Sequence, residues 1–90
     1  MIEKRLLIDN KTGLHARPAT QFVQTAAKFK SKIKVSKAGR EADAKSIISV
    51  LSLGAGKGTE ITLKVEGEDE QAAIDALVAL IQGDFGEGTV

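Results

Sequence analysis

The only histidine of this chain lies in a short run that could carry a transferable phosphoryl group. Residues 13–19 read Gly-Leu-His-Ala-Arg-Pro-Ala, so Arg17 follows His15 by two positions. A neutral imidazole is a good nucleophile near neutral pH, and the N–P bond that it forms stays reactive toward the next acceptor. A nearby guanidinium adds a planar, charge-assisted contact to phosphate oxygens. Together the two side chains predict reversible phosphoryl transfer.

The residues that follow predict a helix that would position this chemistry. From Ala16 onward, apolar residues recur at helical spacing and form one face as far as Phe29. The first amides of a helix lack partners within the helix and lie at the positive end of its dipole, so they bind phosphate oxygens. We therefore expect the backbone amides of Ala16 and Arg17 to cradle the phosphate.

A purely structural role is the main alternative for both side chains. A lone histidine in a small domain is more often a surface or capping residue than a reactive one, and Arg17 alone would be an ordinary solvated residue. However, His15 follows a polar turn at residues 10–13 and lies outside the apolar face of the helix and outside any cluster with metal-ligand spacing. This position favours the reactive role, with no metal and no cofactor.

Composition limits the class of protein. With 90 residues, 42% of them hydrophobic and 28% charged, the chain predicts a single domain, residues 1–90, without disulfides, because it has no cysteine. We expect it to be cytoplasmic, which the absence of cysteine fits, and not inserted in a membrane, because no apolar run approaches the length of a membrane span. A net charge of +1, with three phenylalanines and no tyrosine or tryptophan, argues against a nucleic-acid binder.

Periodicity predicts four strands and three helices. The strands are expected at residues 2–8, 32–37, 40–44 and 60–66, and the helices at 16–29, 47–53 and 68–82, with a frayed tail at 83–90. The order β-α-β-β-α-β-α buries its apolar stripes in an α+β fold, a four-stranded antiparallel sheet with all three helices on one face. The last strand alternates without interruption and should be central.

Three further motifs have structural explanations. Ser46 precedes the apolar run 47–53 and should cap a short helix, although a strand is the competing interpretation; a phosphate there would also suit the helix dipole. The glycine-rich segment 54–59 lacks the spacing of a phosphate-binding loop and predicts a helix end and turn. The acidic residues 68–70 suit the positive end of the last helix and imply no catalytic pair.

The chain resembles the HPr family, the histidine-containing phosphocarriers of the bacterial phosphoenolpyruvate-dependent sugar phosphotransferase system. Residues 12–19 are similar to the active-site signature of the family, and residues 44–47, Ala-Lys-Ser-Ile, are similar to its regulatory serine site. The family fold is an open-faced β-sandwich. The resemblance implies that His15 accepts a phosphoryl group on Nδ1 from Enzyme I and passes it to the IIA component of a sugar permease, with Arg17 assisting.

The same resemblance implies regulation at Ser46 by HPr kinase/phosphorylase. Phosphoserine there would slow transfer at His15 and create a ligand for a catabolite-control repressor. A Crh-like regulatory relative, which lacks the active histidine, and a nitrogen-branch paralogue with other partner proteins remain alternatives. An RNA-binding module would need aromatic residues on the sheet, and the expected strands have none. A hydrolase would need a second catalytic group near His15, where the sequence offers only Arg17.

We expect a monomer that presents an exposed docking surface around His15. The short helix has more apolar residues than one core-facing stripe requires, so some of them should face a partner. The alternative is that Ile47, Ile48 and Leu51 all belong to the core. The residues expected on the docking surface are Thr20, Gln24, Ile47, Ile48 and Leu51.

Overall fold

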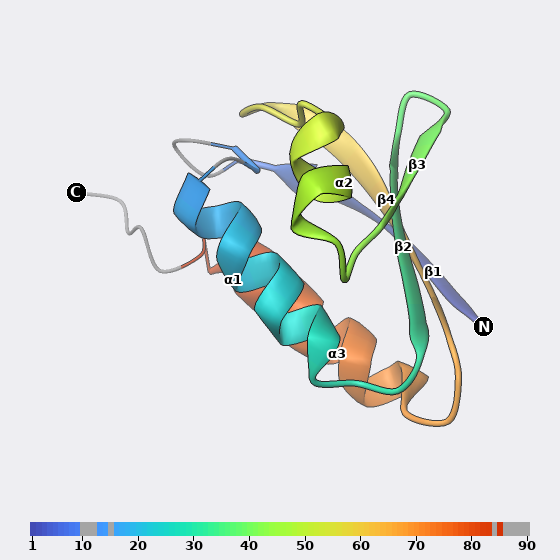
Figure 1. The fold of residues 1–90 in the computed structure, drawn as a ribbon. Coiled ribbons are helices and arrows are strands. Elements are labelled where there is room, and N and C mark those ends of the chain that lie inside the picture. The colour runs from blue at the N-terminus through green and yellow to red at the C-terminus, as the bar shows by residue number, and fades with distance from the viewer. Residues whose placement is uncertain (10–12, 15, 84, 86–90) are drawn as a thin grey trace.

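The residues that the structure describes, 1–9, 13–14, 16–83 and 85, form four antiparallel strands and three helices (Figure 1). In this computed structural model the strands make one sheet in the order β1-β4-β2-β3. The elements are β1 (Ile2–Ile8), α1 (Ala16–Ala27), β2 (Lys32–Lys37), β3 (Arg40–Asp43), α2 (Ile47–Ser52), β4 (Thr59–Glu66) and α3 (Glu70–Gln82). The predicted open-faced β-sandwich is therefore confirmed.

The sheet buries one face against the helices and leaves the other open. On β4, which lies between β1 and β2, Ile61, Leu63 and Val65 are buried, as its uninterrupted alternation predicts. The open face carries charged side chains. Lys34 of β2 lies there between Lys64 of β4 and Asp43 of β3 in the strand register.

Helix α1 packs on this core through the apolar face expected from its spacing. Ala19, Phe22 and Ala26 are fully buried. The α-helix ends at Ala27, and the amide of Phe29 then donates to the Ala26 carbonyl oxygen at 3.2 Å, a tighter turn that carries the chain to the expected helix end.

The hairpin and the short helix also form as expected. Ala38 and Gly39, the turn residues between β2 and β3, both have positive φ, 48° and 84°, which suits the twist of a two-residue hairpin. The last strand residue is Asp43, one before the expected end. Ser46 caps α2, so the competing strand interpretation is wrong. Within the described residues, no helix combines the length and the apolar character that crossing a membrane requires.

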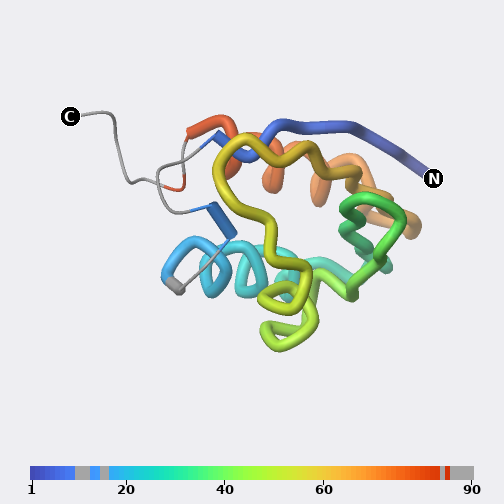
Figure 2. The backbone as a smooth tube through the Cα atoms, turned by 90° about the horizontal axis from the view of Figure 1, so that it is seen from above, coloured from blue at the N-terminus to red at the C-terminus, as the bar shows by residue number. Residues whose placement is uncertain are grey.

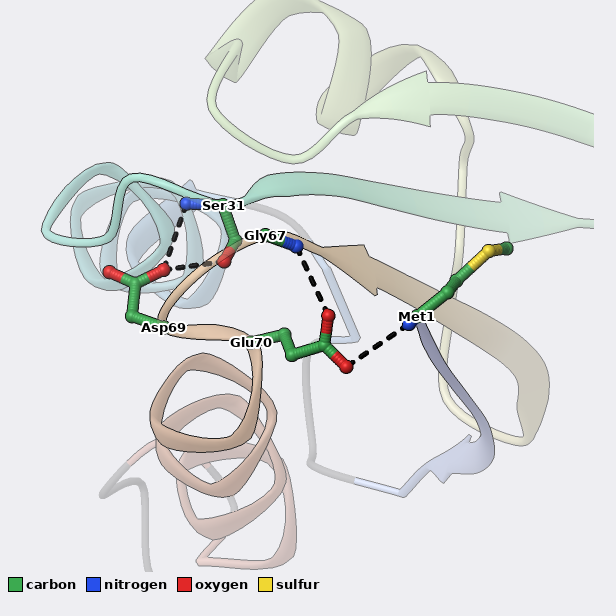
Figure 3. A network of polar contacts seen from close by, with 5 residues as sticks. All are labelled: Met1, Ser31, Gly67, Asp69 and Glu70. Atoms are coloured by element: carbon green, nitrogen blue, oxygen red, sulfur yellow. Dashed lines mark hydrogen bonds and ion pairs between the residues drawn. The ribbon is translucent and has the colours of Figure 1, made fainter.

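The acidic residues before α3 do more than complement its dipole, which corrects the sequence interpretation (Figure 3). Only Glu70 lies in the first turn of α3. Asp69 makes no side-chain cap; its carboxylate instead accepts hydrogen bonds from the Lys30 amide at 2.8 Å, the Ser31 amide at 2.9 Å and the Ser31 hydroxyl. The Ser31 hydroxyl, then the Lys30 and Ser31 amides, lower the pKa of Asp69 to about 2. Asp69 thus joins α3 to the start of β2.

The segment after α3 differs from the frayed tail that we expected. The Gly83 amide donates to the Ala79 carbonyl oxygen at 3.0 Å, and Phe85 is 2% exposed and belongs to the hydrophobic core. A single large aromatic side chain gains enough from burial to hold a short segment against the core. Residues 84 and 86–90 lie outside the described residues.

Candidate functional site

The backbone that leads toward His15 is fixed to the loop after α2. Leu14 is fully buried, and its amide donates to the Ala55 carbonyl oxygen at 2.7 Å. Gly13 has a φ of 66°, and a Cβ added there would lie 2.7 Å from both the Ala55 carbonyl oxygen and the Gly56 Cα. Only glycine fits this close approach without a shift. Gly13 and Leu14 are therefore tightly constrained.

His15 itself lies outside the described residues, whereas Arg17 lies within them. Arg17 is in the first turn of α1 and its side chain is exposed. In the part of the chain that the structure describes, this side chain has no hydrogen bond or ion pair. The guanidinium is thus not engaged by a carboxylate of those residues, so it is available to an anion.

The start of α1 offers donors to an anion from its backbone. Its first turn holds no acidic residue, so no side-chain carboxylate of that turn offsets the positive end of the helix dipole. The amides of Ala16 and Arg17, expected to cradle the phosphate, have no helical carbonyl upstream to bind. Pro18 follows and lacks an N–H, which costs little in a first turn because that donor would be unpaired in any case. The arrangement suits an anion that binds backbone amides.

Ser46 has the geometry of a helix cap. Its backbone is extended, with φ −111° and ψ 114°, and its Oγ accepts a hydrogen bond from the Ser49 amide at 3.3 Å. The preceding turn is held by Asp43, whose carboxylate accepts from the Lys45 amide at 2.9 Å. The predicted capping role is confirmed, and the Ser46 side chain is half-buried.

The expected docking residues are exposed on two neighbouring helices. Ile47 is 36% exposed, Ile48 74% and Leu51 40%, so the alternative that all three are core is wrong. Thr20 and Gln24 of α1 are exposed as well. Helices α1 and α2 contact each other, and Figure 2 shows them side by side from above. Ile47, Ile48 and Leu51 are thus apolar side chains left exposed on one short helix.

Sequence reasoning missed the contact between Leu14 and Ala55. The composition of the glycine-rich segment 54–59 predicts a helix end and a turn, and the segment does end α2, because the Gly54 amide donates to the Leu51 carbonyl oxygen at 3.2 Å. The same segment also holds Leu14 through the Ala55 carbonyl oxygen, and this contact pairs two segments that lie far apart in the chain. No local spacing carries a signal for such a pairing.

Comparison with known proteins gives consistent matches over almost the whole chain. A family described as "PTS HPr component phosphorylation site" matches residues 2–83. Phosphocarrier protein HPr of Cupriavidus necator is 50% identical over 88 residues, 98% of this chain and 99% of that protein. HPr-like protein Crh of Halalkalibacterium halodurans is 50% identical over 82 residues, 91% of this chain and 98% of that protein.

A solved structure agrees with the arrangement described above. The crystal structure of HPr-C-His from Thermoanaerobacter tengcongensis superposes with a TM-score of 0.97 at 53% sequence identity, covering 99% of this chain and 100% of that one. The range matched by the family, residues 2–83, includes Gly13 and Leu14, the start of α1 and the cap of α2. The chain therefore belongs to the HPr family of phosphocarrier proteins of the phosphotransferase system.

Proposed function

We propose that the chain is a phosphocarrier that accepts a phosphoryl group on Nδ1 of His15 from phospho-Enzyme I and passes it to the IIA component of a sugar permease. In each step a bond from phosphorus to the donor breaks while a bond to the acceptor forms, so the carrier returns to its starting state. The observation that carries the proposal is the constrained approach to His15, where the buried Leu14 is held by Ala55.

The first turn of α1 supports the proposal electrostatically. Its first backbone amides and the exposed guanidinium of Arg17 would stabilise the phosphoryl oxygens, which carry the charge of the transferred group. A carrier must not bind its cargo too tightly, because excess stabilisation of the phosphorylated state would slow the next transfer. An exposed arginine, rather than a buried pocket, meets this requirement.

We propose that both protein partners dock on one surface formed by Thr20, Gln24, Ile47, Ile48 and Leu51. The three apolar side chains of α2 supply area whose burial favours association, and the polar side chains of α1 supply a rim. Because this surface must be free for each partner in turn, the carrier would work as a monomer in the cytoplasm, where Enzyme I and the IIA component meet it.

We further propose that Ser46 is phosphorylated by HPr kinase/phosphorylase and that the product binds a catabolite-control repressor. Phosphate at this cap would add nearly two negative charges directly before Ile47 and Ile48. The charge would be stabilised at the start of α2 but would oppose docking of Enzyme I. This gives regulation of His15 without a change of fold.

A second candidate is a regulatory role without phosphoryl transfer, which the 50% identity to a Crh protein favours. The presence of His15 supports the carrier, because the Crh relatives lack the active histidine. A nitrogen-branch paralogue would use the same chemistry with other donor and acceptor proteins.

The deciding experiment is incubation with phosphoenolpyruvate and Enzyme I, followed by mapping of acid-labile phosphate. We expect one phosphorylated residue, His15, and transfer of the label to a IIA component. His15→Ala is the matched control, and circular dichroism establishes that it is folded. Labelling that persists in the folded variant would refute the proposed carrier site, and absence of labelling in the natural chain would favour the regulatory role.

A further inference from the structure

The side chain of Lys37, at the end of β2, donates hydrogen bonds to the backbone at the end of α2. Its Nζ donates to the carbonyl oxygen of Leu53 at 3.1 Å and to that of Gly54 at 3.0 Å. The last turn of α2 contains no basic residue of its own. A cation at a helix C-terminus satisfies unpaired carbonyl groups and complements the negative end of the dipole. Lys37, in the β2–β3 hairpin, therefore supplies the positive charge that the last turn of α2 lacks.

The carbonyl groups that Lys37 holds belong to a segment with little freedom to move. Leu53 is 4% exposed and Ala55 is fully buried, so Gly54 lies between two anchored side chains. The next carbonyl oxygen, that of Ala55, is the acceptor of the Leu14 amide. Gly13 also packs closely on Ala55 and Gly56. A continuous set of contacts thus runs from Lys37 to the residue before His15.

We infer that Lys37 is a positioning residue for transfer at His15, acting through the segment 53–55 and the amide of Leu14. This inference rests on the proposed function, but its first step concerns only the folded chain. Loss of the Lys37 ammonium would free the carbonyl groups of Leu53 and Gly54 and would loosen the acceptor of Leu14. The backbone before His15 would then sample more conformations, and fewer of them would be competent for transfer.

Amide hydrogen exchange tests the first step without any partner protein. We expect Lys37→Met to speed exchange of the Leu14 amide about fivefold, the effect of losing about one net hydrogen bond. The Leu63 amide in the central strand β4 reports global unfolding and should change less. Lys37→Arg should restore most of the protection. If Lys37→Met does not fold, Lys37→Gln also removes the charge, and the exchange of its Leu14 and Leu63 amides is compared instead.

Lys45 provides a matched control. It is a half-buried lysine whose Nζ also donates to a backbone carbonyl oxygen, that of Phe29 at 2.7 Å, but it holds the segment after α1. Lys45→Met should leave the ratio of Leu14 to Leu63 exchange unchanged. Three results would overturn the inference. Exchange of the Leu14 amide could stay unchanged in Lys37→Met, or it could change only as much as exchange of the Leu63 amide. It could also rise equally in Lys45→Met.

The second step is tested by the rate of phosphorylation from Enzyme I. We expect a severalfold slower rate in Lys37→Met and recovery in Lys37→Arg. A natural rate in a variant whose Leu14 exchange is faster would overturn the positioning role while leaving the carrier function intact. Absence of phosphorylation in the natural chain would instead refute the proposed function, and the exchange result would still decide whether Lys37 holds the segment.

Discussion

Asp69 accepts hydrogen bonds from both the amide and the hydroxyl of Ser31, and so ties the residue before α3 to the residue before β2. Ser31 is 1% exposed, so these donors would otherwise lack water as a partner. The contact explains why the carboxylate is ionised far below neutral pH, with its pKa lowered to about 2.

This lowered pKa predicts how stability depends on pH. Because the folded pKa lies below the unfolded value near 4, the carboxylate contributes stability above about pH 4 and loses it as the pH falls toward 2. Asp69→Asn should therefore be less stable at neutral pH and show a shallower loss between pH 4 and 2, measured by urea unfolding. Asp75→Asn, on the exposed side of α3, is the control and should retain the natural slope. Equal slopes for all three chains would contradict the prediction.

Gly13→Ala should disturb the approach to His15. The added Cβ would meet the Ala55 carbonyl oxygen and would also force alanine to a φ of 66°, at a cost of about 1–3 kcal/mol. Gly39→Ala is matched, because its φ is 84° and nothing lies within 4 Å of the added Cβ. We expect both variants to lose stability in thermal unfolding, but only Gly13→Ala to slow phosphorylation from Enzyme I. If Gly39→Ala also slowed phosphorylation, general destabilisation would be sufficient to explain the slower rate of Gly13→Ala.

Arg17→Ala should slow transfer without changing stability. The side chain is exposed and unpaired among the described residues, so its loss removes no structural contact there. Loss of its charge-assisted contact to the phosphoryl group should reduce the rate on the order of tenfold, measured by rapid quench. Arg17→Lys should recover part of the rate, since lysine offers charge without the planar fork. If Arg17→Ala transferred phosphate at the natural rate, Arg17 would be an ordinary solvated residue with no role in transfer.

Ser46→Ala and Ser46→Asp should separate capping from regulation. Alanine removes the acceptor of the Ser49 amide and should cost about 0.5–2 kcal/mol, with transfer at His15 nearly unchanged. Aspartate also caps, so the melting temperature should stay near the natural value, while its charge slows phosphorylation by Enzyme I. The slowing should weaken at high salt. An unchanged rate for Ser46→Asp at low salt would remove the regulatory proposal.

Ile48→Ser should weaken binding of Enzyme I. Ile48 is 74% exposed, so its replacement should scarcely affect folding, whereas loss of its apolar contact should raise Kd about five- to thirtyfold. Leu7, 54% exposed on β1, offers a matched replacement away from the proposed docking surface. Titration calorimetry should show natural affinity for Leu7→Ser. Equal losses in both variants would place docking elsewhere.

Local patterns were sufficient for the elements of this fold. The alternation of β4, the spacing along α1 and the cap at Ser46 are properties of neighbouring residues, and the structure follows each of them. One-residue differences arise where a strand ends, as at Ala44, whose amide still donates to the Ile33 carbonyl oxygen at 3.0 Å although the strand stops at Asp43.

Contacts between distant segments could not be anticipated in the same way. The acidic run before α3 carries a signal for a helix start, but nothing in it specifies that Asp69 turns toward Ser31. Similarly, Lys37 reads as a solvated strand residue until the end of α2 is placed beside it. Phe85 lies two residues after Gly83, in a stretch whose local sequence is typical of a loose tail, yet its side chain is buried in the core. These contacts depend on three-dimensional packing rather than on local sequence.

The open face of the sheet gives the chain a convenient place for a spectroscopic probe. Lys34 is exposed there, and its cross-strand neighbour on β4 is Lys64, a like charge that gives the pair no mutual stabilisation. The sequence has no cysteine, so Lys34→Cys would create a unique thiol for a fluorophore. Since the helices occupy the opposite face, a dye at this position would report partner binding to α1 and α2 through distance-dependent energy transfer without obstructing it.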